Sequence, residues 1–353
     1  MINVSYMRYP VTMLLACFIC QARSGVVTVL HPEDEFDFGD TVVWSPLFQA
    51  TWDVVNAELG GKPQKVDPPN GLMGKLDGFE WDAEKVMPEK DWKVWGGRAT
   101  NAFLKRVNRE TAEMTGEKGD VFTLVAGNPD VIACFGLLNR EVEFENEFFE
   151  SKKKPLAFRT GDKVENMAFF GSAGKLSGEY GDSVKVLGHS NNWHALEVSC
   201  KKADDKVVFY LPPEALAFVD ACEVVRKLRK GFVSGGLHEG DLLCVPYVAL
   251  DVKEDLAGRL SSGRWYGKAG DPWRIGRAEQ VTRFELHEKG ARVRVETSVD
   301  MIPFGPAPRP PQPRNFIYDR PFFVFLWRDG AEWPYFGVWV GDTSALREFQ
   351  SGP

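Results

Sequence analysis

The chain has 353 residues, of which 44% are hydrophobic, 26% charged and 12% aromatic. This composition is typical of a globular protein with enough apolar side chain for a large core. The net charge is −7 and the pI about 5.5. Because a field of this sign repels phosphate backbones, and no basic stripe is interleaved with aromatic residues, we expect no nucleic-acid partner.

The N-terminus has the pattern of an export signal. Arg8 supplies a positive charge, Val11–Cys20 is an apolar run, and Ala22-Arg23-Ser24 offers the small residues that a signal peptidase reads. We therefore predict a signal peptide over residues 1–24 and a single mature domain over residues 25–353. The expected location is secreted, periplasmic or extracellular.

Two alternatives remain for the same segment. Leu14-Leu15-Ala16-Cys17 loosely resembles a bacterial lipobox, which would leave a lipid anchor at Cys17, and the apolar run could instead be a buried first strand or helix. The run is too short to span a bilayer. Since no other segment is apolar for long enough, we predict no transmembrane segment.

The cysteines that follow the predicted signal do not have the spacing of a zinc site. None of them forms a Cys-x-x-Cys pair. Cys222 shares a predicted helical face with apolar residues, which favours a buried thiol. Disulfide pairing is left open for all four, which are Cys134, Cys200, Cys222 and Cys244.

Three helices are predicted from capping residues and apolar spacing. Ser45 can cap the first helix and Pro46 fits its first turn, and the helix runs to Gly60-Gly61. The second helix covers Arg98–Met114. The third covers Glu214–Lys230, with a basic last turn that suits the helix dipole.

Strands are predicted over most of the remaining chain, from β-branched and apolar runs. Helices therefore concentrate toward the N-terminus, and we predict an α+β fold with large, mainly antiparallel sheets. The predicted strands are Thr41–Trp44, Val121–Val125, Val131–Leu138, Leu156–Phe158, Val164–Phe170, Ala195–Cys200, Val207–Leu211, Leu242–Val252, Val281–Leu286, Ala291–Val299, Phe316–Trp327 and Tyr335–Val340.

The motifs of common enzymes and cofactor sites are missing from the sequence. No G-x-S-x-G elbow and no glycine-rich phosphate loop occurs. His189 and His194 lie five apart in a polar segment interpreted as a loop, which is not the spacing of a zinc helix. The acidic run His31–Asp37 and the alternating glutamates of Glu141–Glu147 are interpreted as solvated surface rather than as calcium or catalytic sites. We predict no enzyme, no cofactor and no metal.

The C-terminal third carries motifs of a known family. Phe316-Ile317-Tyr318-Asp319-Arg320-Pro321-Phe322 resembles the F-x-A-D-R-P-F signature of the serpins, and Gly337 lies where serpins carry F-M-G. Thr282–Glu296 resembles the family's segment before the reactive loop, and this match places His287 at the histidine of the region that opens the sheet. Thr41–Leu47, with Ser45 and Pro46, resembles the start of the second serpin helix.

The sequence also departs from the family pattern. The stretch before Trp44 is too short for the usual first helix, and Phe48 replaces an expected serine. The resemblance implies that this chain carries a reactive loop. In inhibitory serpins this loop is cleaved and then inserts into a sheet as a new strand. The hinge of that loop is built from small residues.

Here the loop is dense in proline. Glu296 matches the hinge glutamate and Thr297 follows it, but bulky residues and six prolines within Pro303–Pro313 replace the small hinge residues. Each proline lacks a backbone N–H and fixes φ, so central strands exclude it. Because predicted strands flank the run, it is a loop within a domain rather than a linker.

Two arginines are candidate cleavage sites in this loop. Arg309 lies near the bait position, but Pro310 beyond the bond resists trypsin-like cleavage, whereas Arg314-Asn315 is an ordinary arginine bond.

Our leading hypothesis is an exported, monomeric serpin-like protein that binds a partner through residues 297–315 or another surface without inhibiting proteases. The alternative is a suicide-substrate inhibitor of an extracellular protease that uses this loop. A hydrolase with a site assembled from scattered residues, including His189 or His194, is the third hypothesis.

Overall fold

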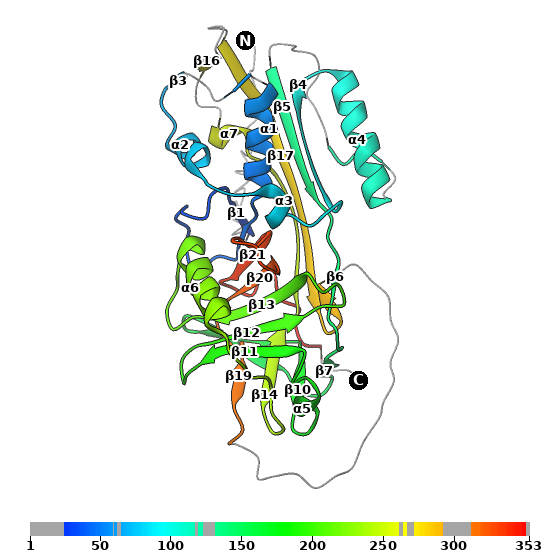
Figure 1. Cartoon of the computed structure of the whole chain (residues 1–353), viewed down its shortest axis with the longest axis vertical. Helices are drawn as coiled ribbons and strands as arrows, with labels where there is room; N and C mark the ends of the chain where they lie inside the picture. Colours follow the sequence, from blue (N-terminus) through cyan, green and yellow to red (C-terminus); the bar gives the residue numbers. More distant parts are fainter. Residues whose placement is uncertain are drawn as a thin grey trace, which may run out of the picture.

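The computed structural model describes residues 25–58, 60–61, 65–116, 119–122, 131–260, 264–266, 272–291 and 312–350. It is an α+β fold, as the sequence predicts (Figure 1). The helices are α1 (Leu47–Glu58), α2 (Gly71–Gly78), α3 (Ala83–Val86), α4 (Asn101–Thr115), α5 (Leu176–Glu179), α6 (Phe218–Gly231) and α7 (Ala257–Leu260).

The strands fall into four sheets. In chain order they are β1 (Val27–Val29), β2 (Val42–Trp44), β3 (Lys65–Asp67), β4 (Trp92–Arg98), β5 (Val131–Leu138), β6 (Val142–Glu143), β7 (Phe149–Glu150), β8 (Leu156–Thr160), β9 (Lys163–Met167), β10 (Phe169–Ala173), β11 (Val184–His189), β12 (His194–Ser199), β13 (Asp205–Leu211), β14 (Leu242–Pro246), β15 (Val248–Asp255), β16 (Arg264–Tyr266), β17 (Pro272–His287), β18 (Gly290–Ala291), β19 (Asn315–Ile317), β20 (Phe322–Arg328) and β21 (Phe336–Val340).

Most strand pairs are antiparallel, in agreement with the prediction. The seven-stranded sheet has the order β1-β2-β21-β20-β13-β12-β11, and the four-stranded sheet has the order β19-β14-β10-β7. The eight-stranded sheet joins β3-β16-β17-β18-β6 with β4, β5 and β15, and β8 pairs with β9. The parallel pairs are β1 with β2, β14 with β19, and β5 with β17.

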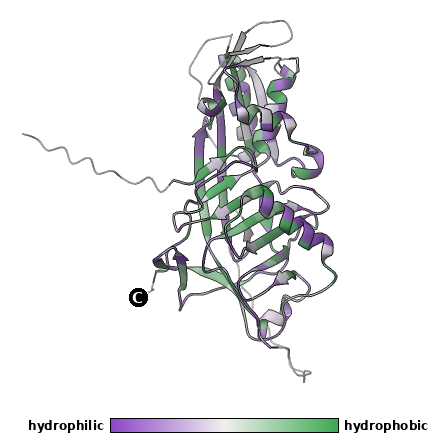
Figure 2. Cartoon of the chain, turned by 90° about the vertical axis from the view of Figure 1, so that its left-hand side faces the viewer, coloured by the Kyte–Doolittle hydropathy of each residue, from purple (hydrophilic) through white to green (hydrophobic). Residues whose placement is uncertain are grey.

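The seven-stranded sheet is buried on both faces. Every residue of β13 and β21 is buried. Helix α6 packs on the sheet through Phe218, Cys222 and Val225, a spacing of one helical face. In Figure 2 the strands of this sheet are largely hydrophobic, whereas α6 carries both hydrophobic and hydrophilic residues. The sheet is therefore the main core of the molecule.

The eight-stranded sheet carries α1 on one face and α4 on the other (Figure 1). Phe135 and Gly136 are neighbours in β5 and so point to opposite faces. The ring of Phe135 lies 6.0 Å from that of Phe103 in α4. On the other face, a β-carbon at Gly136 would lie 3.0 Å from Thr51 Oγ1 in α1. Glycine therefore permits the close approach of α1.

The pairing between β5 and β17 ends halfway along β17. It runs from the pair Arg274 with Val131 to the pair Val281 with Leu137. Beyond this point the chain after β5 leaves the sheet edge, and β18 next pairs with β17, at Leu286. We call this region the split, and it covers Thr282–Glu285 of β17.

Two predicted helices begin later than expected. The second helix begins at Asn101 rather than Arg98, because Trp92–Arg98 is strand β4 and Thr100 caps the helix by accepting from Phe103 N–H at 3.2 Å. The third helix begins at Phe218 rather than Glu214.

Three predicted strands are each divided in two. The breaks fall at Ala168, at Tyr247 and after Ile317. At Ala168 and Tyr247 the backbone N–H groups donate across to other segments, to Arg347 O and to Ala168 O. At each break the chain passes from one sheet to another, a change that periodicity does not reveal.

Two other predicted strands fall partly outside the described residues. Val121 and Phe122 lie in a bend rather than a strand, and residues 123–125 are outside the described residues. Residues 292–299 are also outside them, as is the predicted signal peptide with Cys17.

The four cysteines Cys134, Cys200, Cys222 and Cys244 are buried and free. The acidic run is not simply solvated surface, because His31 is buried and Asp34 accepts the N–H groups of Leu30 and His31. None of the described helices combines the length and apolarity needed to cross a bilayer.

Candidate functional site

The Ser45-Pro46 motif joins the start of α1 to the far end of the chain. Ser45 Oγ accepts the N–H of Leu47 at 3.2 Å, which is the predicted cap, and donates to Tyr335 O at 2.8 Å. Gly337 lies two residues further, in β21, and pairs with Trp44 and Phe325. The motifs from the two ends of the sequence are thus neighbours in the seven-stranded sheet.

The Phe316–Phe322 motif turns the chain from the four-stranded sheet into the seven-stranded one. Phe316 in β19 and Phe322 in β20 are fully buried. Between them, Asp319 O accepts the N–H of Arg159, and Arg320 donates to Asn192 O. Pro321 directly precedes β20. These residues anchor the chain after the proline segment.

The other end of the proline segment follows β17 and β18. His287 is the last residue of β17, and its Nδ1 accepts the N–H of Lys289 at 3.2 Å within the tight turn to β18. The loop candidates Glu296, Thr297, Arg309 and Pro310 lie outside the described residues.

Arg314 and Asn315 lie within the described residues, where the chain enters β19. Arg314 Nη2 bonds Asp241 Oδ2 at 2.6 Å and Gly236 O at 2.7 Å. Asn315 is exposed and pairs with Leu242 of β14. The arginine that the sequence offers as an ordinary cleavable residue is thus held by a buried carboxylate.

The segment around His189 and His194 is a β-hairpin rather than a polar loop. The two histidines are cross-strand partners of β11 and β12. His194 is buried and packs edge-on against Phe316 and Tyr318. Burial, followed by the charges of Arg320 and His189, lowers the pKa of His194 to about 3. Its Nε2 has no hydrogen-bond partner among the described groups.

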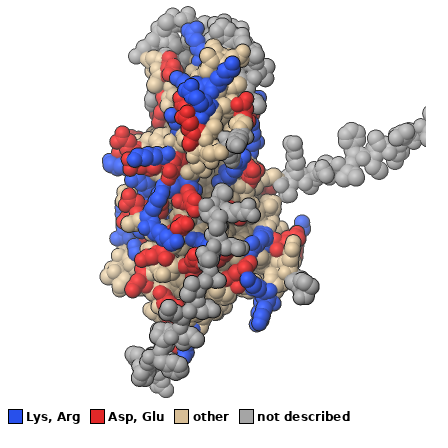
Figure 3. Space-filling model, turned by 90° about the vertical axis from the view of Figure 1, so that its right-hand side faces the viewer, with Lys and Arg blue, Asp and Glu red and all other residues tan. Residues whose placement is uncertain are grey.

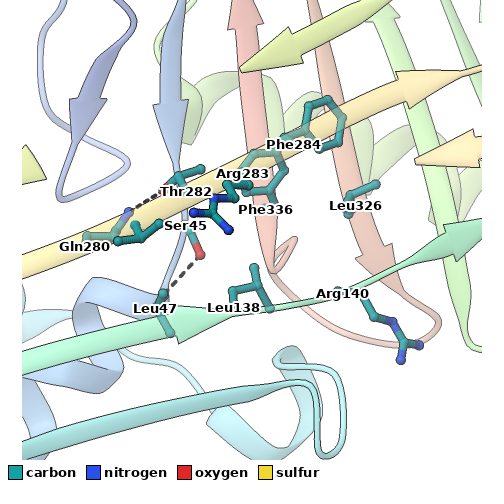
Figure 4. A pocket seen from close by; sticks show the side chains of 11 residues that line it. Ser45, Leu47, Leu138, Arg140, Gln280, Thr282, Arg283, Phe284, Leu326 and Phe336 are labelled. Carbon is teal, nitrogen blue, oxygen red and sulfur yellow. Dashed lines mark hydrogen bonds between the residues drawn. The ribbon is translucent and has the colours of Figure 1, made fainter. Parts of the chain in front are cut away.

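The split in the eight-stranded sheet opens pockets on both sides. On the side of α1 lies a small pocket of about 30 Å³. Residues of β5, β17, β20 and β21 line it (Figure 4). On the other side lies a pocket of about 740 Å³. Leu138, Arg140 and Phe284 line both of them. Both pockets therefore border the split.

Arg140 follows β5, where the chain leaves β17 at the split. Its guanidinium, with the side chain 9% exposed, bonds Asp91 through Nη1 and Asp205 through Nη2. Asp205 is 1% exposed and also accepts from Tyr335 Oη at 3.2 Å. This ion cluster ties the segment after β5 to the seven-stranded sheet.

A third pocket, of about 230 Å³, lies between α6 and the end of the seven-stranded sheet. Glu197 is buried there and accepts from Lys185 Nζ at 2.7 Å and Arg229 Nε at 2.6 Å. Burial alone would raise the pKa of Glu197, but Arg229 and Lys185 together hold it below its ordinary value. The carboxylate is therefore ionised, and the positive charges of Lys185 and Arg229 balance its charge.

The described residues contain no group of three or more histidine, cysteine or acidic side chains that could hold a metal. On the face shown in Figure 3, acidic and basic side chains are interspersed over the described residues.

Solved structures with the same fold are serpins. Human thyroxine-binding globulin complexed with thyroxine matches with a TM-score of 0.56 and 12% identity, over 86% of this chain and 92% of that one. The thermophilic serpin tengpin in the native state matches with a TM-score of 0.56 and 13% identity, over 87% and 90%. Human glycosylated kallistatin matches with a TM-score of 0.52 and 13% identity, over 86% of this chain and 92% of that one.

No protein-family model matches the sequence, and no curated protein matches it significantly. The structural matches nevertheless show that the chain has the serpin fold, as its motifs predict. Because the sequence identity is only 12–13%, they show the fold alone.

Three acidic partners in these sites were missed by sequence reasoning. Asp241 lies 73 residues from Arg314, and Asp205 lies 65 residues from Arg140. Glu197 falls inside a strand and looks like an outward-facing charge. No local motif indicates the basic partners of these three carboxylates, so only the tertiary structure reveals the ion pairs.

Proposed function

We propose that this chain is a divergent, exported member of the serpin family that acts by binding and does not inhibit proteases by loop insertion. It is not an enzyme. The observation that carries the proposal is the proline segment, which stands between β18 and β19, where serpins carry their bait. An inserted strand would have to pair with β5 and β17, and each proline would leave a ladder hydrogen bond unmade, at about 1 kcal/mol each.

One feature of the described residues supports this proposal. At the end of the loop, Arg314 is held by Asp241 rather than presented to solvent.

The decisive measurement is stability before and after the loop is nicked. Inhibitory serpins gain thermal stability when the loop is cut and inserts. We expect little or no rise in Tm after a broad-specificity protease cuts between residues 297 and 309.

The matched control is a variant whose six loop prolines are replaced by alanine. If the prolines block insertion, this variant should gain Tm on nicking while the natural chain does not. A large gain in the natural chain would overturn the proposal. Mixing the protein with serine and cysteine proteases gives a second readout, because an SDS-stable covalent complex would establish the suicide-inhibitor alternative.

Binding of a small molecule is a second form of the proposed function. One compared structure is a serpin complexed with thyroxine, and the pocket of about 740 Å³ beside the split is within the size range of small-molecule sites. A thermal-shift screen of small organic molecules tests this form. A hit should lose its effect when Leu250, which lines the pocket, is enlarged in the variant Leu250→Trp.

A further inference from the structure

Asp241 is a buried carboxylate that faces the end of the proline segment. Its side chain is 1% exposed. Oδ2 accepts the N–H of His238 at 2.8 Å and Nη2 of Arg314 at 2.6 Å, and Oδ1 accepts the backbone N–H of Arg314 at 2.8 Å. Burial alone would raise the pKa of Asp241, but its hydrogen bonds with Arg314 and His238 hold it below the ordinary value. The carboxylate therefore stays charged at neutral pH.

Arg314 is held through its side chain, its backbone N–H and its carbonyl. Nη2 also donates to Gly236 O at 2.7 Å, and the guanidinium lies 5.2 Å from the centre of the Phe316 ring. The carbonyl of Arg314 accepts the N–H of Leu242 at 2.9 Å. Side chain, backbone N–H and carbonyl are thus all engaged within the protein.

Trypsin-class proteases require these same groups to be free. The arginine side chain must enter a pocket that ends in an aspartate, and the scissile carbonyl must enter an oxyanion hole. Asp241 already supplies such a carboxylate, and Arg314 donates to it in a bidentate manner, from Nη2 to Oδ2 at 2.6 Å and from Nε to Oδ1 at 3.3 Å. Cleavage therefore requires the local structure to open first.

We propose that Asp241 and Arg314 form a clamp that withholds the Arg314–Asn315 bond from trypsin-class proteases and keeps the C-terminal end of the proline segment docked on β14. Arg314 is then an anchor and not a bait residue. A protease that cuts further upstream leaves β19 and β20 in place. The clamp is independent of whether the chain inhibits the protease that cuts it.

The test is trypsin digestion of the full chain well below its Tm, with each cut quantified by mass spectrometry. The reference is the Lys152–Lys153 bond in the loop between β7 and β8, where the Lys152 side chain is 80% exposed. Since proteolysis of a closed site follows its opening equilibrium, we expect Arg314–Asn315 to be cut at least about 100-fold more slowly than this reference.

The variant Asp241→Asn keeps the shape of the side chain and removes its charge, and we expect it to speed cleavage at Arg314–Asn315 by at least about 10-fold relative to the reference bond. The matched control is Asp329→Asn, which removes an exposed carboxylate that lies 3.8 Å from Arg229, and it should change nothing at Arg314. Fast cleavage of Arg314–Asn315 in the natural chain, or an unchanged rate in Asp241→Asn, would overturn the clamp.

If Asp241→Asn does not fold, Arg314→Lys carries the test, because lysine keeps the charge and the protease specificity but loses the bidentate fork. Faster cleavage at the same bond, and faster hydrogen exchange of the β19 amides, are then expected, and unchanged values of both would refute the clamp. An SDS-stable protease complex formed by a cut upstream would refute the proposed function but leave the clamp intact.

Discussion

The seven-stranded and the eight-stranded sheets differ in how completely they are filled. In the seven-stranded sheet, β13, β20 and β21 are almost wholly buried and carry a dense group of aromatic rings. The eight-stranded sheet is paired along the upper part of β17 and then divides at Val281, with a pocket on each side. Arg140 lies at the division and ties the departing chain to the filled sheet.

This difference indicates which sheet can change. A closely packed core transmits strain and resists rearrangement, because each displaced side chain loses its contacts. The split sheet already has space beside Phe284 and Leu138. A change of strand pairing would therefore begin at the split.

The largest effect should come from removing a buried aromatic side chain from the closely packed seven-stranded sheet. Phe325 is fully buried in β20, and Phe325→Ala should lower the free energy of unfolding by about 3–5 kcal/mol. The matched change is Phe284→Ala in β17, where pockets already border the ring, and about 2–3 kcal/mol is expected there. Urea unfolding measures both, and equal losses would contradict the contrast.

Removing Arg140 should be nearly as costly. Arg140→Met leaves Asp205 charged and buried without its cation, and about 3 kcal/mol of stability should be lost. The control Asp91→Asn removes the more exposed partner and should cost about 1 kcal/mol. Loss of hydrogen-exchange protection should centre on β5 and β17, and loss centred on β13 instead would show that the cluster does not hold the split.

The stability of the natural chain should fall as the pH drops below about 6.5. His194 has an ordinary pKa of 6.5 when unfolded and about 3 when folded, so between these values the unfolded chain binds the extra proton. Above pH 6.5 the imidazole is neutral in both states, and His194 does not lower the free energy of unfolding. As the pH falls from 6.5 toward 3, protonation of His194 in the unfolded chain lowers this free energy progressively. Between pH 7 and pH 5 the loss should be about 2 kcal/mol.

The variant His194→Phe should remove this part of the pH dependence, because phenylalanine keeps the ring contacts with Phe316 and Tyr318. Measurement of unfolding at both pH values compares the two chains. An equal slope in the variant would show that His194 does not titrate on unfolding.

A methyl group added to β21 should have the smallest of the four effects. A β-carbon at Gly337 would lie 3.0 Å from Phe218 and from Phe325, so Gly337→Ala must displace a ring. We expect a loss of about 1–2 kcal/mol in the free energy of unfolding. Gly231→Ala is the control, since its β-carbon would meet nothing within 4 Å, and thermal unfolding of the two should differ clearly.

Much of the fold could be predicted where local chemistry acts alone. Ser45 and Pro46 marked the start of α1, and the apolar run of β5 marked a buried strand. The serpin fold was expected only from the resemblance of the Phe316–Phe322 motif to that family. The helix start at Asn101 was misplaced because the apolar spacing from Arg98 also fits a strand followed by a cap.

The candidate sites were less predictable than the fold. The loop candidates Glu296, Thr297, Arg309 and Pro310 remain predictions. Arg314 was recognised as an arginine next to an ordinary bond, but its engagement by Asp241 was not, because the two residues meet only when β14 and β19 pair.

By itself, the sequence determined the properties that a few neighbouring residues control: the caps, the buried strands, and a proline segment that resists becoming a central strand. Tertiary structure decided where strands break between sheets, where β5 and β17 part, and which carboxylate holds Arg314. The physical reason is that buried ion pairs and sheet register depend on residues far apart in the chain. Their energies appear only after distant segments have been brought together and water has been excluded.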